Sequence, residues 1–245
     1  MIAFTSTAQQ NSYTKTMNTK HPLLLRTILS ITTILTVLIV DQWSKFIVKT
    51  TMLLHEKIEI TDWFYICFIE NRGMAFGMDF IGTLFLSIFR IVAVGFFCWL
   101  LVRIIQKKLS FGLIFCFSLI LSGAAGNIID NCLYGMIFEE SPTYGWFCDA
   151  PAKLVSWGEG YGSFLSGKVV DMFYFPLFTW PDWVPLLGGQ IFFNAIFNVA
   201  DAAISCGAVA LLLFHHRYLN SQLFSKSQPN QDTPSPSTHP KQDEA

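Results

Sequence analysis

Four stretches of this sequence are apolar over a length that can cross a lipid bilayer. They cover residues 23–40, 80–102, 111 to about 132, and 191–214. A helix needs about 20 apolar residues to span the hydrocarbon core, where lipid offers no partner for backbone N–H and C=O groups. Of the 245 residues, 52% are hydrophobic and 13% are charged, about half the charged fraction of a soluble domain. The sequence predicts an α-helical membrane protein with four transmembrane helices.

Basic residues outside these stretches predict how the helices are oriented. The head and the first turn of the first stretch carry Lys15, Lys20 and Arg26 without an acid, and the turn between the second and third stretches carries Arg103, Lys107 and Lys108 without an acid. Lysine and arginine are enriched in cytoplasmic loops, and the other two loops, about 49–79 and 133–190, are rich in acids. We therefore expect both termini in the cytoplasm and these two loops outside.

The predicted transmembrane domain, residues 23–217, lies between a cytoplasmic head, residues 1–22, and a tail, residues 218–245. The tail is polar and proline-rich, a composition typical of disordered chain. Within the second outward loop, residues 141–165 form an insertion rich in glycine, proline and aromatic residues, which we expect to be a flap or a partner surface. The short run from Gly167 to Phe173 predicts a small β-like region outside the membrane.

Polar residues within the fourth stretch need an explanation. Asn194, Asn198, Asp201 and Ser205 recur at steps of four, three and four, which predicts one face of a helix. An ionised carboxylate in hydrocarbon costs several kcal/mol, so Asp201 needs a partner or a function. In a helix that begins near residue 191, Asp201 lies about ten residues, or roughly 15 Å, from the outer end.

Two other predicted helices carry polar residues at their outer ends. In the third stretch Gly123, Asn127 and Asp130 are spaced at helical intervals. The first stretch is expected to end with Asp41 and Lys45 at i and i+4, a geometry suited to an ion pair. We expect these polar atoms to meet in the outer leaflet.

A purely structural interpretation stays open for several of these residues. Taken alone, Asn194, Asn198 and Ser205 of the fourth stretch are better explained by interhelical hydrogen bonding. An interfacial ion pair explains the two charges of the first stretch, and close helix packing explains Gly126. The interpretation is weakest for Asp201, because a buried acid needs a partner.

Cysteine spacing and net charge argue against two classes of site. The six cysteines include no CxxC pair and no accompanying histidine cluster, so we predict no metal site. Cys67, Cys132 and Cys148 are expected outside, where a disulfide among them could form. A formal net charge of −1 and the lack of a basic face argue against a nucleic-acid partner.

Five motifs follow one another along the chain. They are Asp41-Gln42-Trp43-Ser44-Lys45, Asn71-x-Gly73-x-Ala75-Phe76-Gly77, the run from Gly123 to Asp130, the run from Val169 to Phe173, and the run from Phe197 to Ile204. In this order they closely resemble the motifs of the lipoprotein signal peptidases, or signal peptidase II, which are membrane aspartic peptidases of bacteria. The resemblance covers about Leu23 to Arg217.

This resemblance implies a catalytic pair, Asp171 and Asp201. The family removes the signal peptide from diacylglyceryl-modified prolipoproteins by cutting before the lipidated cysteine, without metal or cofactor. It acts in the bacterial cytoplasmic membrane, with the active site toward the outer leaflet. The family also keeps residues that shape the pocket, position the substrate or hold the aspartates. At these positions this chain has Asp41, Lys45, Asn71, Gly73, Asn127, Asp130 and Asn198. The expected partners are prolipoproteins and membrane lipids, and we expect a monomer.

Two carboxylates that face one cavity fit this chemistry, because they share a proton and act as one base and one acid. Asn198, one turn before Asp201, is a candidate donor to a carboxylate or to the tetrahedral oxyanion. The sequence leaves open which aspartate carries the proton at rest.

One departure from the family pattern concerns a substrate or carboxylate contact. The family usually has arginine directly after the aspartate of the third-helix motif, whereas this chain has Asn131. Arg90 lies about ten residues into the second predicted helix, which is deep for a charge unless it faces the cavity. Arg90 is therefore a candidate substitute for that arginine.

Two other functional classes compete with a peptidase. A proton-coupled carrier or channel would also bury acids, but it needs ionisable groups through the whole membrane thickness, and here they gather on the outer side. A non-catalytic assembly subunit would not require residues 171 and 201 to be acids. Replacing either acid by asparagine separates the three classes.

Overall fold

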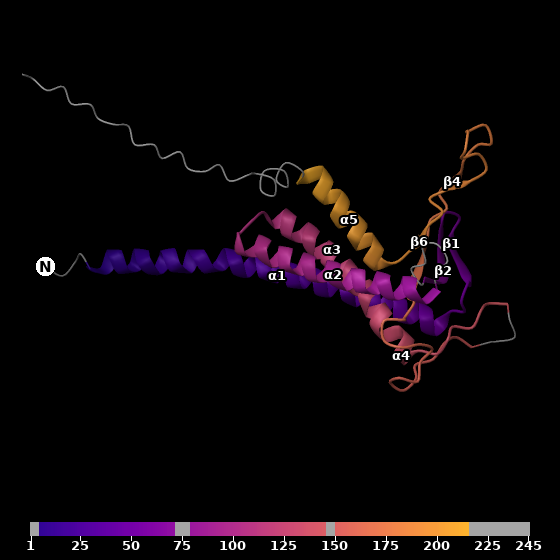
Figure 1. The fold of residues 1–245 in the computed structure, drawn as a ribbon. Helices are drawn as coiled ribbons and strands as arrows, with labels where there is room; N and C mark the ends of the chain where they lie inside the picture. The colour runs from indigo at the N-terminus through magenta and orange to yellow at the C-terminus, as the bar shows by residue number, and fades with distance from the viewer. Residues whose placement is uncertain (1–4, 72–78, 146–149, 216–245) are drawn as a thin grey trace, which may run out of the picture.

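The first three long helices lie roughly along one direction, the last is inclined to them, and the strands gather beyond the end of the first helix (Figure 1). The computed structural model describes residues 5–71, 79–145 and 150–215. Its longer helices are α1 (Thr5–Thr51), α2 (Asp79–Gln106), α3 (Phe111–Ile129) and α5 (Val199–Phe214). Among the described residues, Leu23–Thr51, Ser87–Gln106 and Phe111–Ile137 are long and apolar enough to cross a membrane, and Val199–Phe214 is a shorter apolar helix. The prediction of a helical membrane protein is confirmed, with a fourth helix shorter than expected.

Helix α3 lies at the centre and packs against α1, α2 and α5. Its N-cap is Ser110, whose hydroxyl accepts a hydrogen bond from Leu113 N, and its buried face carries Leu113, Ile114 and Phe117. A Cβ on Gly123 would lie 2.2 Å from the carbonyl oxygen of Ala200, so only glycine allows α3 and α5 to approach this closely. After Ile129 the helix continues as a π-helical turn, η1 (Asp130–Tyr134), and the short α4 (Gly135–Ile137).

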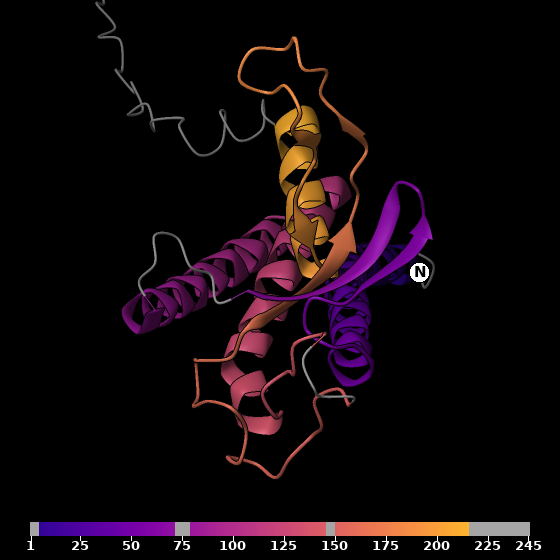
Figure 2. The same cartoon turned by 90° about the vertical axis from the view of Figure 1, so that its right-hand side faces the viewer.

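A four-stranded antiparallel sheet lies across the helix ends (Figure 2). Its order is β1 (Lys57–Thr61), β2 (Phe64–Asn71), β3 (Val169–Tyr174) and β6 (Ile196–Phe197). Ile69 of β2 is opposite Asp171, and Asn71 is opposite Val169. A separate pair, β4 (Phe178–Thr179) and β5 (Ile191–Phe192), forms a hairpin. The β-like run predicted up to Phe173 is thus a central strand.

The predicted helix over residues 191–214 is wrong at its beginning. Residues 191–192 and 196–197 are strands, and the helix begins at Val199 because Asn198 is its N-cap. Asn194 therefore does not share a helical face with Asn198: its side chain accepts a hydrogen bond from the Tyr174 hydroxyl at 2.9 Å. Asp201 lies in the first turn of α5, not ten residues inside it. Ser205 is on the helix but exposed.

The predicted end of the first helix near Asp41 and Lys45 is also wrong, because α1 continues to Thr51. Both charged side chains are fully buried and paired, so the helix carries them without exposing them to lipid. Cys67 and Cys132 are free thiols. Cys148, Gly73 and the predicted tail, residues 218–245, lie outside the described residues.

Candidate active site

Asp171 lies in the middle of β3, the strand that crosses the helix ends. Its side chain is buried, with 4% of the residue exposed. Its Oδ1 atom accepts a hydrogen bond from Asn198 Nδ2 at 2.7 Å, and the Asn71 side chain also donates to this carboxyl group. Two asparagines from separate segments therefore hold one carboxyl group in place.

Asp201 lies in the first turn of α5, half-buried. Its Oδ1 accepts a hydrogen bond from Asn127 Nδ2 at 2.9 Å, and its Oδ2 accepts one from the backbone N–H of Asn198 at 3.4 Å. The Asn198 side-chain oxygen accepts in return from the backbone N–H of Asp201 at 2.9 Å. This reciprocal capping box satisfies amide groups that would otherwise have no partner at a helix start.

Asn198 thus contacts both predicted catalytic acids, and it is fully buried. Its side-chain amide donates to Asp171, while its carbonyl oxygen and backbone N–H bind Asp201. The same amide lies 3.2 Å from the carbonyl oxygen of Val170 and 3.3 Å from Asn127 Oδ1. The arrangement fixes the two carboxyl groups relative to one another.

Lys45 is the centre of a buried charge cluster beneath the two aspartates. Its Nζ lies 2.9 Å from Asp41 Oδ2, 2.8 Å from Asp130 Oδ2 and 2.9 Å from Asn127 Oδ1. The three charged side chains are fully buried. One ammonium group therefore compensates two carboxylates and orients Asn127, which in turn donates to Asp201.

Asp41 and Gln42 tie this cluster to the start of α5. Asp41 Oδ1 accepts from the backbone N–H of Ala200 at 2.8 Å, and Gln42 Nε2 donates to Asp130 Oδ1 at 2.8 Å. A Cβ on Gly126 would lie 2.6 Å from Asp41 Oδ2, so the glycine makes room for the carboxylate as well as for helix packing. The ion pair expected between Asp41 and Lys45 is present at 2.9 Å, and both side chains are buried inside the protein.

Arg90 and Asn131, the two residues that depart from the family pattern, are bonded to one another. The guanidinium group of Arg90 donates to Asn131 Oδ1 at 2.7 Å, and Asn131 Nδ2 donates to the carbonyl oxygen of Gly167 at 2.7 Å. Burial opposes the positive charge of Arg90, while Asp201, Asp130 and Asp171 favour it. A guanidinium group from α2 therefore lies within the electrostatic reach of both candidate acids.

Burial is the main reason that the pKa of Asp171 is raised, to about 7, and repulsion from the Asp201 charge adds to it. The hydrogen bonds from Asn198 and Asn71 act in the opposite direction but do not cancel this effect. Near neutral pH, Asp171 therefore holds a proton in a substantial fraction of the molecules.

Sequence reasoning missed a second buried charge cluster. Lys49 Nζ lies 2.5 Å from Glu70 Oε1 and 2.8 Å from Ser141 Oγ, and Lys168 Nζ lies 3.0 Å from Glu70 Oε2 and also pairs with Glu140. Burial favours a high pKa for Glu70, but Lys49, Lys168 and Ser141 together bring it below its ordinary value. The cluster fastens α1 to β2 directly before Asn71, and to the chain that enters β3.

Part of this cluster had a signal in the sequence. Lys49 follows Lys45 by four residues, so it continues the helical face of Asp41 and Lys45. Nothing local indicated that Lys168 meets Glu70, since almost 100 residues separate them. Among the described residues, no group of histidine, cysteine and acidic side chains could hold a metal ion.

Comparison with known proteins identifies relatives that share most of this chain. A family model described as signal peptidase (SPase) II matches residues 33–217. The lipoprotein signal peptidase of Porphyromonas gingivalis is 44% identical over 198 residues, which are 79% of this chain and 85% of the relative. That of Amoebophilus asiaticus is 37% identical over 161 residues, 62% of this chain and 61% of the relative.

The fold is also similar to solved structures. A bacterial membrane enzyme solved by the in meso method at 1.9 Å resolution has a TM-score of 0.51 and 24% sequence identity. The match covers 76% of this chain and 93% of that one. At this identity the likeness concerns the fold alone.

Proposed function

The chain belongs to the signal peptidase II family, and on this premise we propose that Asp171 and Asp201 are its catalytic pair. Membership makes it a multi-pass membrane peptidase with a role in lipoprotein signal peptide processing. The proposed reaction is hydrolysis of a diacylglyceryl prolipoprotein immediately before the lipidated cysteine. The observation that carries this assignment is that Asn198 holds both carboxyl groups.

In the proposed resting state Asp171 carries the proton and Asp201 is ionised. The raised pKa of Asp171 supports the first assignment. Both carboxylate oxygens of Asp201 accept hydrogen bonds from N–H groups, and the side chain lies at a helix N-terminus. N–H donors and the positive end of the helix dipole suit an anion, which supports the second assignment.

The proposed reaction starts with water. Asp201 removes a proton from the water as its oxygen attacks the scissile carbonyl carbon, while the Asp171 hydroxyl donates a hydrogen bond to the carbonyl oxygen. Asp171 then protonates the leaving nitrogen, the C–N bond breaks, and its electron pair stays on that nitrogen. Proton exchange with solvent restores the starting state of the pair.

Arg90 is proposed to replace the arginine that the family carries at the position of Asn131. It is held by Asn131 at 2.7 Å, and the charge of Asp201 favours its cation. A guanidinium group there stabilises the negative charge that accumulates when the tetrahedral intermediate forms. Asn131 is then a positioning residue, because it binds Arg90 and Gly167.

The proposed site faces the outer leaflet of the bacterial cytoplasmic membrane, with both termini in the cytoplasm. The distribution of basic residues supports this orientation. A diacylglyceryl cysteine has its acyl chains in the outer leaflet and its signal peptide across the membrane, so the scissile bond lies at the outer interface. The sheet that carries Asp171 lies across the helix ends, which suits a bond at that depth (Figure 2).

A cleavage assay tests the proposed reaction. The purified full-length protein is incubated in lipid nanodiscs with a synthetic prolipoprotein that carries a diacylglyceryl cysteine, and the products are identified by mass spectrometry. We expect one cut, immediately before the modified cysteine, and no cut in the same peptide without the lipid. A cut elsewhere, or equal cleavage of the unlipidated peptide, would overturn the proposed reaction.

A further inference from the structure

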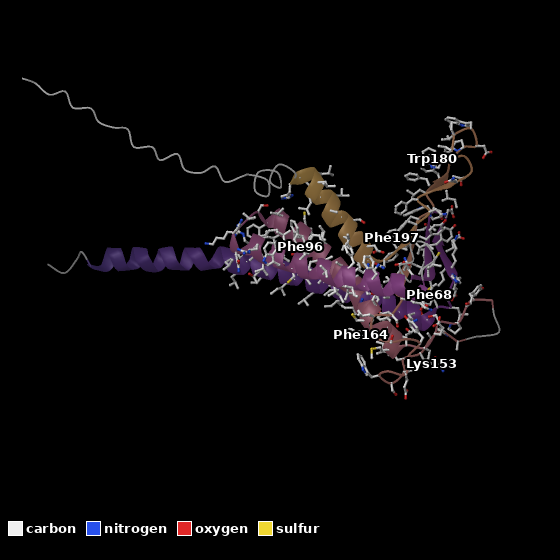
Figure 3. All side chains as sticks on the ribbon, viewed as in Figure 1. Phe68, Phe96, Lys153, Phe164, Trp180 and Phe197 are labelled. Atoms are coloured by element: carbon white, nitrogen blue, oxygen red, sulfur yellow. The ribbon has the colours of Figure 1, made fainter. Side chains whose placement is uncertain are left out.

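The chain between β3 and α5 forms a hairpin that extends away from the rest of the molecule. Phe178 of β4 pairs with Phe192 of β5, and Thr179 pairs with Ile191. Figures 1 and 2 both show this hairpin extending sideways, past the helices and on the side of α5. In Figure 3, Trp180 of the hairpin lies well away from Phe197, which belongs to strand β6 of the sheet.

The surface of this hairpin is apolar and exposed. Leu186 at its tip is 95% exposed, and Trp183 is 81% exposed. Other large apolar side chains that are exposed in this segment are Leu177, Phe178, Leu187, Ile191, Phe192 and Phe193. Between residues 175 and 197 the only charged residue is Asp182. Such a concentration of exposed apolar surface marks an interaction site.

The hairpin has a defined shape. The rings of Phe178 and Phe192 are stacked with centroids 4.8 Å apart, and Trp180 meets Phe192 edge-on at 5.8 Å. The backbone N–H of Trp180 donates to Gln190 O at 2.9 Å, and that of Gly189 donates to Trp180 O at 3.0 Å. Stacking and backbone pairing therefore hold the exposed tip in one conformation.

Leu186 stands in an unfavourable backbone conformation. Its φ is 68°, in a region of backbone conformation that residues other than glycine, asparagine and aspartate rarely adopt. A bulky apolar residue that is both in this conformation and almost fully exposed is not explained by packing within the hairpin. The position makes sense where the side chain has an apolar partner outside the protein.

Helix α5 alone is slightly too short to cross the hydrocarbon core, because its 16 residues rise about 24 Å and the core is about 30 Å thick. With the C-terminal end of α5 at the inner surface, the base of the hairpin lies within about 6 Å of the outer surface. The exposed residues Val209, Leu212, Leu213 and Phe214 of α5 form a lipid-facing surface. The hairpin joins α5 through β6, so its exposed apolar surface continues directly from a helix that lies in the membrane.

We propose that residues 176–193 are an interfacial anchor whose tip, with Trp183 and Leu186, inserts into the outer leaflet beside α5. Tryptophan is enriched at the membrane interface, where its ring is apolar and its N–H remains hydrated. The hairpin carries almost no charge, which suits insertion among acyl chains better than it suits contact with another protein, because protein interfaces have a polar rim. Anchoring is independent of which residues are catalytic, because it requires only that α5 lies in the membrane.

Site-specific fluorescence tests the anchor. An environment-sensitive fluorescent amino acid replaces Leu186 in the full-length protein, which is placed in nanodiscs of phosphatidylcholine and phosphatidylglycerol. The matched control carries the same amino acid at Glu159, an exposed position in the loop insertion. Each protein is titrated with aqueous iodide and, separately, assembled with lipids that carry a nitroxide near the top of the acyl chain.

At position 186 we expect blue-shifted emission, quenching by the lipid nitroxide several-fold stronger than at position 159, and protection from iodide. Equal iodide quenching at both positions would overturn the anchor. Blue-shifted emission that is insensitive to the lipid nitroxide would also overturn it, and would indicate a second copy of the chain or a protein partner instead. Prolipoprotein processing by the labelled protein verifies that it is folded.

Discussion

Asn198 and Asp201 cap the first turn of α5 reciprocally: the Asp201 N–H donates to Asn198 Oδ1 at 2.9 Å, and the Asn198 N–H donates to Asp201 Oδ2 at 3.4 Å. The side-chain amide of the same asparagine donates to Asp171 at 2.7 Å. The start of the helix and the geometry of the proposed catalytic pair therefore depend on one residue. Stability and activity can be separated there by the choice of substitution.

Replacing Asn198 by serine should reduce activity more than stability. Serine is a good N-cap, so α5 keeps its start, but its short side chain cannot donate to Asp171. We expect prolipoprotein processing to fall at least tenfold while thermal unfolding in detergent stays near that of the wild type. Asn198→Ala should lose the cap as well, at a cost of about 0.5–2 kcal/mol. Wild-type processing by Asn198→Ser would contradict the proposed role of this amide.

Replacing Lys45 by methionine should destabilise the protein strongly. The substitution leaves the buried carboxylates of Asp41 and Asp130 without a counter-charge, and such a change costs about 3–5 kcal/mol. Denaturant unfolding in detergent measures the loss, with Lys107→Met on the exposed surface as the matched control. Equal stability of the two variants would show that Lys45 does not hold the cluster together.

The raised pKa of Asp171 predicts how stability changes with pH. The folded-state value of about 7 lies above the ordinary value of 3.8, so between these values the folded protein binds a proton that the unfolded chain lacks. This carboxyl group therefore lowers stability progressively as the pH rises from about 4 to about 7. The melting temperature should fall more between pH 5 and pH 8 for the wild type than for Asp171→Asn. Parallel pH profiles would refute the raised pKa.

Replacing Arg90 by alanine should slow processing severalfold or more, because a positive charge near both acids is lost. Arg103→Ala, in the last turn of α2 and exposed, is the matched control and should process normally. Asn131→Ala should have a smaller effect, since it frees the guanidinium group without removing it. Wild-type kinetics for Arg90→Ala would exclude the proposal that Arg90 replaces the family arginine.

The sequence predicted the helical membrane fold, because apolar length and composition determine whether a segment can lie in lipid. It also predicted that Asp41, Lys45, Asn127 and Asp130 would meet, and they form one buried cluster. Helical spacing and motif order were sufficient there, since each contact joins positions that neighbouring helices present at the same level of the bundle.

The start of α5 could not be predicted by the same reasoning. An asparagine within an apolar run suits a hydrogen bond inside a helix and equally a helix N-cap, and the strands before it are too short and aromatic for periodicity to distinguish. The pairing of β2 with β3 and of Lys168 with Glu70 joins segments about 100 residues apart, for which local patterns carry no information.

The most direct test of the catalytic pair is processing of a diacylglyceryl prolipoprotein by Asp171→Asn and Asp201→Asn, with Asp62→Asn on the exposed surface as the matched control. Asparagine keeps the shape of the side chain and removes the titrating oxygen. Each of the first two variants should accumulate uncut precursor at wild-type protein levels, while the control processes normally. Normal processing by either Asp171→Asn or Asp201→Asn would contradict the assignment of this pair.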